Sequence, residues 1–220
     1  GQCTTGSCAP GVPAGTATGD LLFSFCEADT EDTWSASGWT IIESIGNGGT
    51  TTAGSKLTIL SKVSEGTAPT RTFAHGGGDH GQCVLIAVTT GTYETVFTYA
   101  ASGVHSQTTD TTSRTIPGSA PSQTDCLVVM AFTGYNDNAI TRGANCTGWT
   151  NANLTSLTER FDNLYNGGDG GTLCVATGTY TGVIDYGSTT VTDSVTSESG
   201  GDISIATCAP FSPHRIMVVQ

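Results

Sequence analysis

The sequence predicts an all-β protein, an antiparallel β-sandwich of jelly-roll type with about a dozen strands. Short segments alternate apolar and polar residues, and turn residues separate them at intervals of roughly 8–12 residues. The chain also holds 40 Thr, 20 Ser and 30 Gly among its 220 residues. Threonine is β-branched and favours strands, whereas glycine permits tight turns. We therefore expect a single domain over residues 1–220, with an extended N-terminal arm over 1–19.

The expected strands follow one another along the chain. In Lys56–Val63, three apolar residues lie on one face and both lysines lie on the other, which is typical of a half-buried strand. Similar patterns occur at 21–27, 39–45, 171–178 and 202–208. Two further segments, 83–88 and 126–132, are apolar on both faces, which predicts central strands covered on two sides.

A single segment, residues 153–166, predicts a helix. Its apolar side chains recur at three- and four-residue spacing, at Leu154, Leu157, Phe161 and Leu164. Many Thr and Asn residues in the same segment weaken that prediction.

The two halves of the chain repeat the same order of parts. Residues 19–25 lead to Gly38-Trp39-Thr40 and a later strand, and residues 124–130 lead to Gly148-Trp149-Thr150 and a later strand. In each half, glycine permits a turn and the tryptophan anchors a strand. Two related halves are therefore expected, although chance recurrence in a Gly- and Thr-rich chain is the alternative.

Eight cysteines, an even number, suggest a disulfide-stapled exported protein, and eight cysteines allow 105 pairings. Cys3 and Cys8 are close enough in sequence to close a small terminal loop. The cysteines inside apolar strands are either bridged or small buried hydrophobic residues: Cys26, Cys83, Cys126, Cys174 and Cys208. The spacings contain no zinc pattern, and we expect no metal and no cofactor.

The charge excludes some partners. A formal net charge of −12, with seven Lys and Arg, leaves no basic surface for nucleic acid. No apolar run approaches the roughly 18 residues that a membrane span needs. We expect neither nucleic acid nor membrane as a partner.

Several motifs, in order, resemble a loosely defined family of tailed-bacteriophage virion proteins. They are residues 13–22 with Gly19-Asp20-Leu21-Leu22, then 37–40, 56–63, 125–129 and 148–150. The resemblance spans most of the chain and implies a β-sandwich on the particle surface, as a head decoration or tail-associated protein. The chain departs from the family in having more cysteines. It also begins at Gly1 without Met or an obvious first apolar strand, from which we expect processing or a missing segment.

Residues that could carry chemistry gather in two places. His75-Gly76-Gly77-Gly78 has the form of an esterase oxyanion loop, but the chain has no Gly-x-Ser-x-Gly nucleophile motif. His75, Asp79 and His80 could ligate a metal, although solvated loop histidines are the preferred interpretation. Paired carboxylates suggest glycoside hydrolysis, but a solvated acidic loop is the preferred interpretation. The carboxylates lie in two segments, the first with Glu27, Asp29, Glu31 and Asp32 and the second with Glu159 and Asp162.

These observations predict a non-enzymatic structural protein on the surface of a virus particle, most directly a bacteriophage capsid decoration protein. Its expected partners are the major capsid protein or another virion protein, and further copies of itself in a symmetric homo-oligomer. Residues 213–220, including Ile216 and Val218, form either a terminal strand or an inter-subunit contact.

Three alternatives remain. The first is a carbohydrate- or receptor-binding module of a tail fibre that contacts host surface glycans. Trp34 in a polar loop is the candidate contact, together with Tyr93, Tyr99 or Tyr135. The others are a secreted hydrolase and a subunit of an extracellular filament or surface layer.

Overall fold

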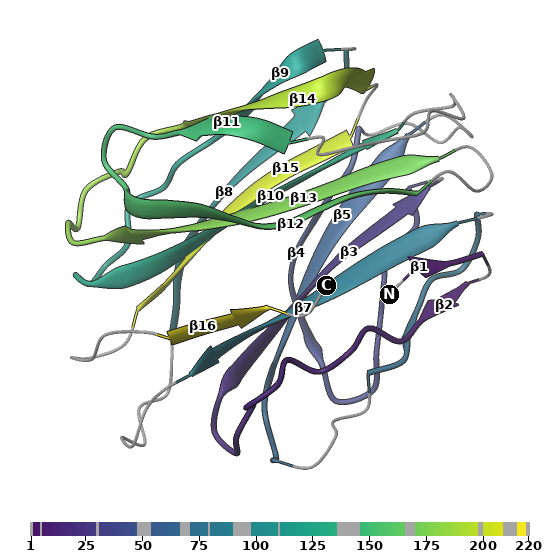
Figure 1. The fold of residues 1–220 in the computed structure, drawn as a ribbon, viewed down its shortest axis with the longest axis horizontal. Helices are drawn as coiled ribbons and strands as arrows, with labels where there is room; N and C mark the ends of the chain where they lie inside the picture. Colours follow the sequence, from purple (N-terminus) through teal and green to yellow (C-terminus); the bar gives the residue numbers. More distant parts are fainter. Residues whose placement is uncertain are drawn as a thin grey trace.

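In the computed structural model, the described residues form sixteen β-strands in four stacked layers (Figure 1). The structure describes residues 1–220 with the exception of 1, 5, 30, 48–53, 67–70, 79, 90–97, 110, 136–145, 166–169, 198–199, 209–214 and 219–220. All pairings between the described strands are antiparallel. The described residues contain no helix, and hence none long and apolar enough to cross a membrane.

Two large sheets form the two inner layers. Sheet I has the order β1 (Gln2–Cys3), β7 (Gly81–Thr89), β3 (Leu21–Asp29), β5 (Ser55–Val63) and β4 (Thr40–Ile45), and β16 (Arg215–Val218) also pairs with β7. Sheet II has the order β12 (Thr155–Tyr165), β13 (Gly171–Tyr180), β10 (Cys126–Tyr135), β15 (Gly200–Cys208) and β8 (Thr98–Gln107).

Two smaller sheets cover the outer faces. Sheet III, with the order β11 (Cys146–Thr150), β14 (Thr189–Ser197) and β9 (Thr111–Ile116), packs on sheet II. The pair β2 (Ser7–Cys8) and β6 (Phe73–Ala74) packs on sheet I. The central strands of both large sheets are therefore buried on both faces, which explains why 83–88 and 126–132 are apolar throughout.

Three hydrophobic clusters separate the four layers. The middle cluster alternates along β3 with Phe23 and Phe25, and along β10 with Leu127 and Val129. The outer clusters contain side chains from the opposite face of the same strands, such as Leu22 of β3 and Val128 of β10. The predicted antiparallel β-sandwich is confirmed. The jelly-roll connectivity is not, because each large sheet takes four consecutively paired strands from one half of the chain.

Four disulfides connect these layers, and they account for all eight cysteines. Cys26–Cys83 joins β3 to β7 inside sheet I, and Cys126–Cys208 joins β10 to β15 inside sheet II. Cys3–Cys8 joins β1 to β2, and Cys146–Cys174 joins β11 to β13, so each of these two fastens an outer layer to a large sheet. Four disulfides indicate an oxidising, extracellular type of environment.

The two halves share one strand plan. The order β7-β3-β5-β4 in sheet I corresponds to the order β15-β10-β13-β12 in sheet II. The outer layers correspond as well, since β6 pairs with β2 and bridges to Ser35, just as β14 pairs with β9 and β11. The expected related halves are therefore visible in the topology.

The helix predicted over residues 153–166 is wrong, because this segment forms β12. Its register against β13 shifts between Thr155 and Thr158 and again between Glu159 and Phe161. Each shift adds a residue to the strand, so Leu157 packs in the outer cluster while Phe161 reaches the middle one. These bulges break the two-residue alternation and produce the helix-like spacing.

Candidate functional site

The apolar alternation of β3 ends in two carboxylates on the face that meets sheet II. Phe23 and Phe25 lie in the middle cluster, and the next two residues of the same face are Glu27 and Asp29. Both acidic side chains are buried. This correction to the expected solvated acidic loop arises because the loop 75–80 and sheet II cover the end of the strand.

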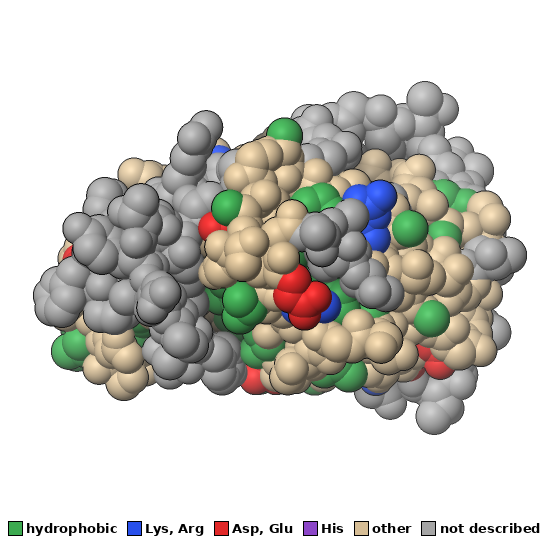
Figure 2. Space-filling model, turned by 90° about the horizontal axis from the view of Figure 1, so that it is seen from below, with side chains coloured by type: hydrophobic (Ala, Val, Ile, Leu, Met, Phe, Trp, Pro, Cys, Tyr) green, Lys and Arg blue, Asp and Glu red, His purple; other side chains and the backbone are tan. Residues whose placement is uncertain are grey.

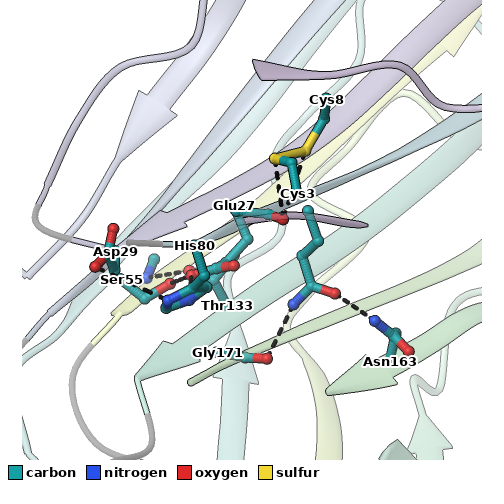
Figure 3. A network of polar contacts seen from close by, with 12 residues as sticks. Cys3, Cys8, Glu27, Asp29, Ser55, His80, Thr133, Asn163 and Gly171 are labelled. Atoms are coloured by element: carbon teal, nitrogen blue, oxygen red, sulfur yellow. Dashed lines mark hydrogen bonds and ion pairs between the residues drawn. A yellow bond between two sulfur atoms is a disulfide. The ribbon is translucent and has the colours of Figure 1, made fainter. Parts of the chain in front are cut away.

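His80 lies between these two carboxylates (Figure 3). Its Nε2 lies 3.3 Å from Oε1 of Glu27, and its Nδ1 lies 3.8 Å from Oδ2 of Asp29. The hydroxyl of Ser55 donates a second hydrogen bond of 3.0 Å to the same Glu27 oxygen. The ring of His80 stacks on Tyr165 at 5.4 Å between centroids. His80 is therefore a buried bridge and not the expected solvated loop histidine.

Sheet II closes this cluster with a glycine and an amide network. A Cβ at Gly171 would lie 2.5 Å from Glu27 Oε1 and 2.6 Å from His80 Nε2, so no other residue fits there without displacement. Gln82 donates a 2.9 Å hydrogen bond to the carbonyl of Gly171 and accepts one of 2.6 Å from Asn163 (Figure 3). These bonds join β7 of sheet I to β12 and β13 of sheet II.

The glycines of the loop 75–80 allow it to lie against acidic side chains. Gly78 has a φ of +81°, and a Cβ there would overlap the carboxylate of Asp29. His75 lies at the other end of the loop, with its Nδ1 3.8 Å from Asp32 and its ring 4.2 Å from that of Trp34. Burial lowers the pKa of His75 below its ordinary value, although the nearby Asp32 and Glu27 charges oppose that shift.

The Glu27–His80–Asp29 arrangement has the connectivity of a proton relay, since one imidazole contacts a carboxylate with each nitrogen. The side chains of Glu27 and His80 have no exposed surface, and that of Asp29 is 2% exposed. A reacting group must be reached by its substrate. The geometry therefore favours a structural cluster that joins β3 to the loop before β7, where sheet II covers both, over a catalytic centre in this conformation.

A second buried cluster lies between sheets II and III. Arg114 of β9 lies 3.6 Å from Oδ1 of Asp202, donates a 2.9 Å hydrogen bond to the carbonyl of Thr133 and lies 5.2 Å above the ring of Phe132. His105, whose side chain is 48% exposed, lies 2.8 Å from the other oxygen of Asp202. Burial raises the pKa of Asp202 and lowers that of Arg114, and each opposite charge counters the other's shift. The cluster fastens the outer layer to sheet II.

One group among the described residues has the atoms of a metal site. The ligand atoms of Cys146, Asp162 and Cys174 lie within 4.8 Å of one another. The two cysteines are joined in a disulfide, so they do not offer thiolates. Asp162 instead accepts a 3.2 Å hydrogen bond from the backbone N–H of Cys146.

The other acidic candidate, Glu159, lies on β12 opposite Ala176 of β13. Its carboxylate accepts a 3.3 Å hydrogen bond from the indole of Trp149. Burial and the nearby Asp162 charge raise the pKa of Glu159, and the bond from Trp149 opposes that shift. The structure does not bring Glu159 together with Glu27.

The remaining candidates have different outcomes. Trp34, expected as a surface contact, is fully buried in the outer cluster of sheet I because loop and strand residues of the arm cover it. Cys3 and Cys8 are bonded to each other. Ile216 and Val218 lie on β16 opposite Val88 and Ile86 of the same chain. Asp79, Tyr93 and the side chain of Tyr99 lie outside the described residues, and Tyr135 is buried.

Sequence reasoning missed the partners that complete both clusters, Gln82, Asn163, Arg114 and Asp202. The signal was a charged or amide residue placed within otherwise strand-like alternation, where burial requires a partner. Which residue is the partner depends on the packing of two sheets, and no local pattern encodes it.

Comparisons with protein-family models, with curated proteins and with solved structures give no match for this chain.

Proposed function

We propose that the chain is a structural protein on the surface of a virus particle, most directly a capsid decoration protein of a tailed bacteriophage. The observation that carries the proposal is the cross-linked architecture. Two disulfides lie inside the large sheets, and two fasten the outer layers to them. Such a module keeps its shape outside the cell, where a particle surface must persist.

The buried polar clusters support the same role. The Glu27–His80 contact and the Arg114–Asp202 pair both lie between layers, where they fix how one sheet sits on the next. Breaking a buried pair costs several kcal/mol, so these clusters favour a single arrangement of the layers.

The surface is suited to a hydrated particle. On the face shown in Figure 2, the described residues show few charged side chains, and most of their atoms belong to uncharged polar side chains or to the backbone. The net charge of −12 disfavours nonspecific attachment to nucleic acid and to anionic surfaces.

One observation favours a second candidate, a subunit of an extracellular filament or surface layer. The C-terminal strand β16 follows the strands of the second half in the chain but pairs with β7 of the first half. Strand addition to a sheet edge is a common means of linking subunits.

Immunogold electron microscopy on the native source separates the two candidates. Antibodies to the folded chain should label the heads or tails of particles, and cross-linking mass spectrometry should join the chain to the major capsid protein or another virion protein. Label along fibres or a cell-surface lattice would support the second candidate. Label on neither kind of assembly would contradict both.

A further inference from the structure

The last strand of the chain completes the sheet of the first half. β1, which precedes β2 and β3, pairs with β7 of the first half, and β8, which precedes β9 and β10, pairs in the same way with β15 of the second half. β1 and β8 therefore correspond. β16 follows β15 of sheet II, yet it crosses to pair with β7 of sheet I.

The register makes this correspondence specific. β3 occupies one edge of β7 over Gly81–Val88, so β1 and β16 both lie on the other edge. There β1 pairs with Gly81 and Gln82, while β16 pairs with the stretch from Ile86 to Thr89. In sheet II, β8 alone pairs along the whole length of the corresponding edge of β15. β16 and β1, placed end to end and running in the same direction, thus occupy the position that β8 fills in the other half.

From this crossing of β16 we propose that the β7 edge also accepts β16 from a second copy of the same chain. The proposal rests on the structural role given above and identifies the partner as another copy. The ladder between β16 and β7 consists of backbone pairs, and the same pairs form whether β16 comes from the same chain or from a second one. Among the described strands, β16 pairs with β7, so exchange between copies opens the ladder between these two strands.

Each copy then offers one donor strand and one receiving edge. The contact is heterologous, because β16 of one copy meets β7 of the next. Repetition of such a contact yields a ring if the rotation closes and an open fibre if it does not. In either assembly, the donated β16 and the resident β1 together form the edge that β8 forms within one chain.

Cysteine pairs can distinguish the origin of β16. Cys26 and Cys83 are directly opposite with Cα atoms 4.2 Å apart, the close and non-hydrogen-bonded type of pair. Successive residues of β7 direct their backbone N–H and C=O groups to alternate edges of the strand. Val88 and Ile216, which are opposite on the other edge, therefore form a close pair of the same non-hydrogen-bonded type. We would prepare Val88→Cys and Ile216→Cys as separate variants, mix and incubate them, and then oxidise the mixture. The expected product is a disulfide between residues 88 and 216 of different chains, detected by mass spectrometry and as a doubled mass on a non-reducing gel.

The matched control is the pair Val104→Cys on β8 and Ile203→Cys on β15, which are also directly opposite. Cys126–Cys208 is a close pair on the other edge of β15, so the same alternation makes Val104 and Ile203 a non-hydrogen-bonded pair. Because β8 lies in the middle of the chain, its exchange needs much larger unfolding, and the mixed control variants should remain monomeric. A chain that carries both Val88→Cys and Ile216→Cys reports closure within one chain. An intrachain disulfide there, with no interchain product from the mixture, would overturn the proposal. Failure of both to form would also overturn it, since the register would then be wrong.

A measurement without new cysteines covers the case in which these variants fail to fold. Met217 and Ala87 are the next opposite residues along the ladder, so by the same alternation they form a hydrogen-bonded pair. The Met217→Pro chain lacks the backbone N–H that residue 217 contributes to this pair. In light scattering, we expect the native chain to self-associate and the Met217→Pro chain to remain monomeric. A native chain that stays monomeric at every concentration would refute strand exchange. If immunogold label persists on particles in that case, the proposed particle role stands and this inference alone fails.

Discussion

The carboxylate of Glu27 lies 3.3 Å from Nε2 of His80, and neither side chain reaches solvent. The other nitrogen of the same imidazole lies 3.8 Å from Asp29, whose side chain is also buried. Two carboxylates on one strand thus share one ring from a glycine-rich loop. The contact ties β3 to the loop 75–80 at the point where sheet II covers both.

Substitution at this pair should show strong coupling. Removal of one partner leaves the other buried without its counterpart, so His80→Gln and Glu27→Gln should each lower the free energy of unfolding by about 3–5 kcal/mol. The double variant should lose less than the sum, with a coupling of roughly 0.5–3 kcal/mol. Urea unfolding of the four proteins measures the cycle. Losses that add within about 0.5 kcal/mol would show that the contact has no energetic role.

Gly171 should tolerate no side chain. Its missing Cβ leaves room for Glu27 Oε1 and His80 Nε2, so Gly171→Ala should destabilise the fold by about 1–3 kcal/mol. Gly76→Ala is the matched control, because the nearest atoms to its added Cβ, those of Asp32, lie 4.0 Å away. Thermal unfolding of both variants tests the difference. Equal effects at the two positions would argue against the tight packing of β13 on the cluster.

Stability should fall as the pH decreases below the ordinary pKa of histidine. Burial lowers the pKa of His75, so the unfolded chain binds its proton at a higher pH than the folded chain does. The contribution of His75 is therefore present above about pH 6.5 and is lost as the pH falls toward the lower folded value. His75→Phe keeps an aromatic ring beside Trp34 and removes the titration, so it should flatten this dependence. Urea unfolding across pH 4.5–7.5 provides the slopes, with Trp34→Phe as the control that retains the imidazole; identical slopes for His75→Phe and the native chain would contradict the assignment.

The disulfides should differ in their contribution according to the loops that they close. Cys26–Cys83 has a sequence separation of 57 and Cys3–Cys8 one of 5. In the chain-entropy treatment, these loops correspond to about 4 and about 2 kcal/mol. Paired Cys→Ala variants of each bridge, compared by urea unfolding, should therefore differ by about 2 kcal/mol. The opposite ranking would mean that strain or packing, and not loop closure, governs the two bridges.

Local pattern was sufficient for the regularly alternating and the continuously apolar strands. The alternation in β5, the continuous apolar runs in β7 and β10 and the glycine-bounded turns all follow from side chains that point to opposite faces. The recurrence of Gly-Trp-Thr also marked the two halves, because in each half the motif follows the first central strand, β3 or β10. These features depend on residues that are close together in the chain, so they can be predicted directly from the sequence.

The tertiary structure decided which polar residues are enclosed and which strands belong together. Trp34 and the acidic residues of β3 looked exposed in a polar stretch, but the arm, the loop 75–80 and sheet II cover them. The bulges of β12 exist only in its pairing with β13, so its spacing imitated a helix. The crossing of β16 to β7 of the first half rests on contacts between segments far apart in the chain. Composition and alternation by themselves determined an all-β sandwich of two related halves; burial and partner choice depend on what packs across the sheets, and only the folded chain supplies that.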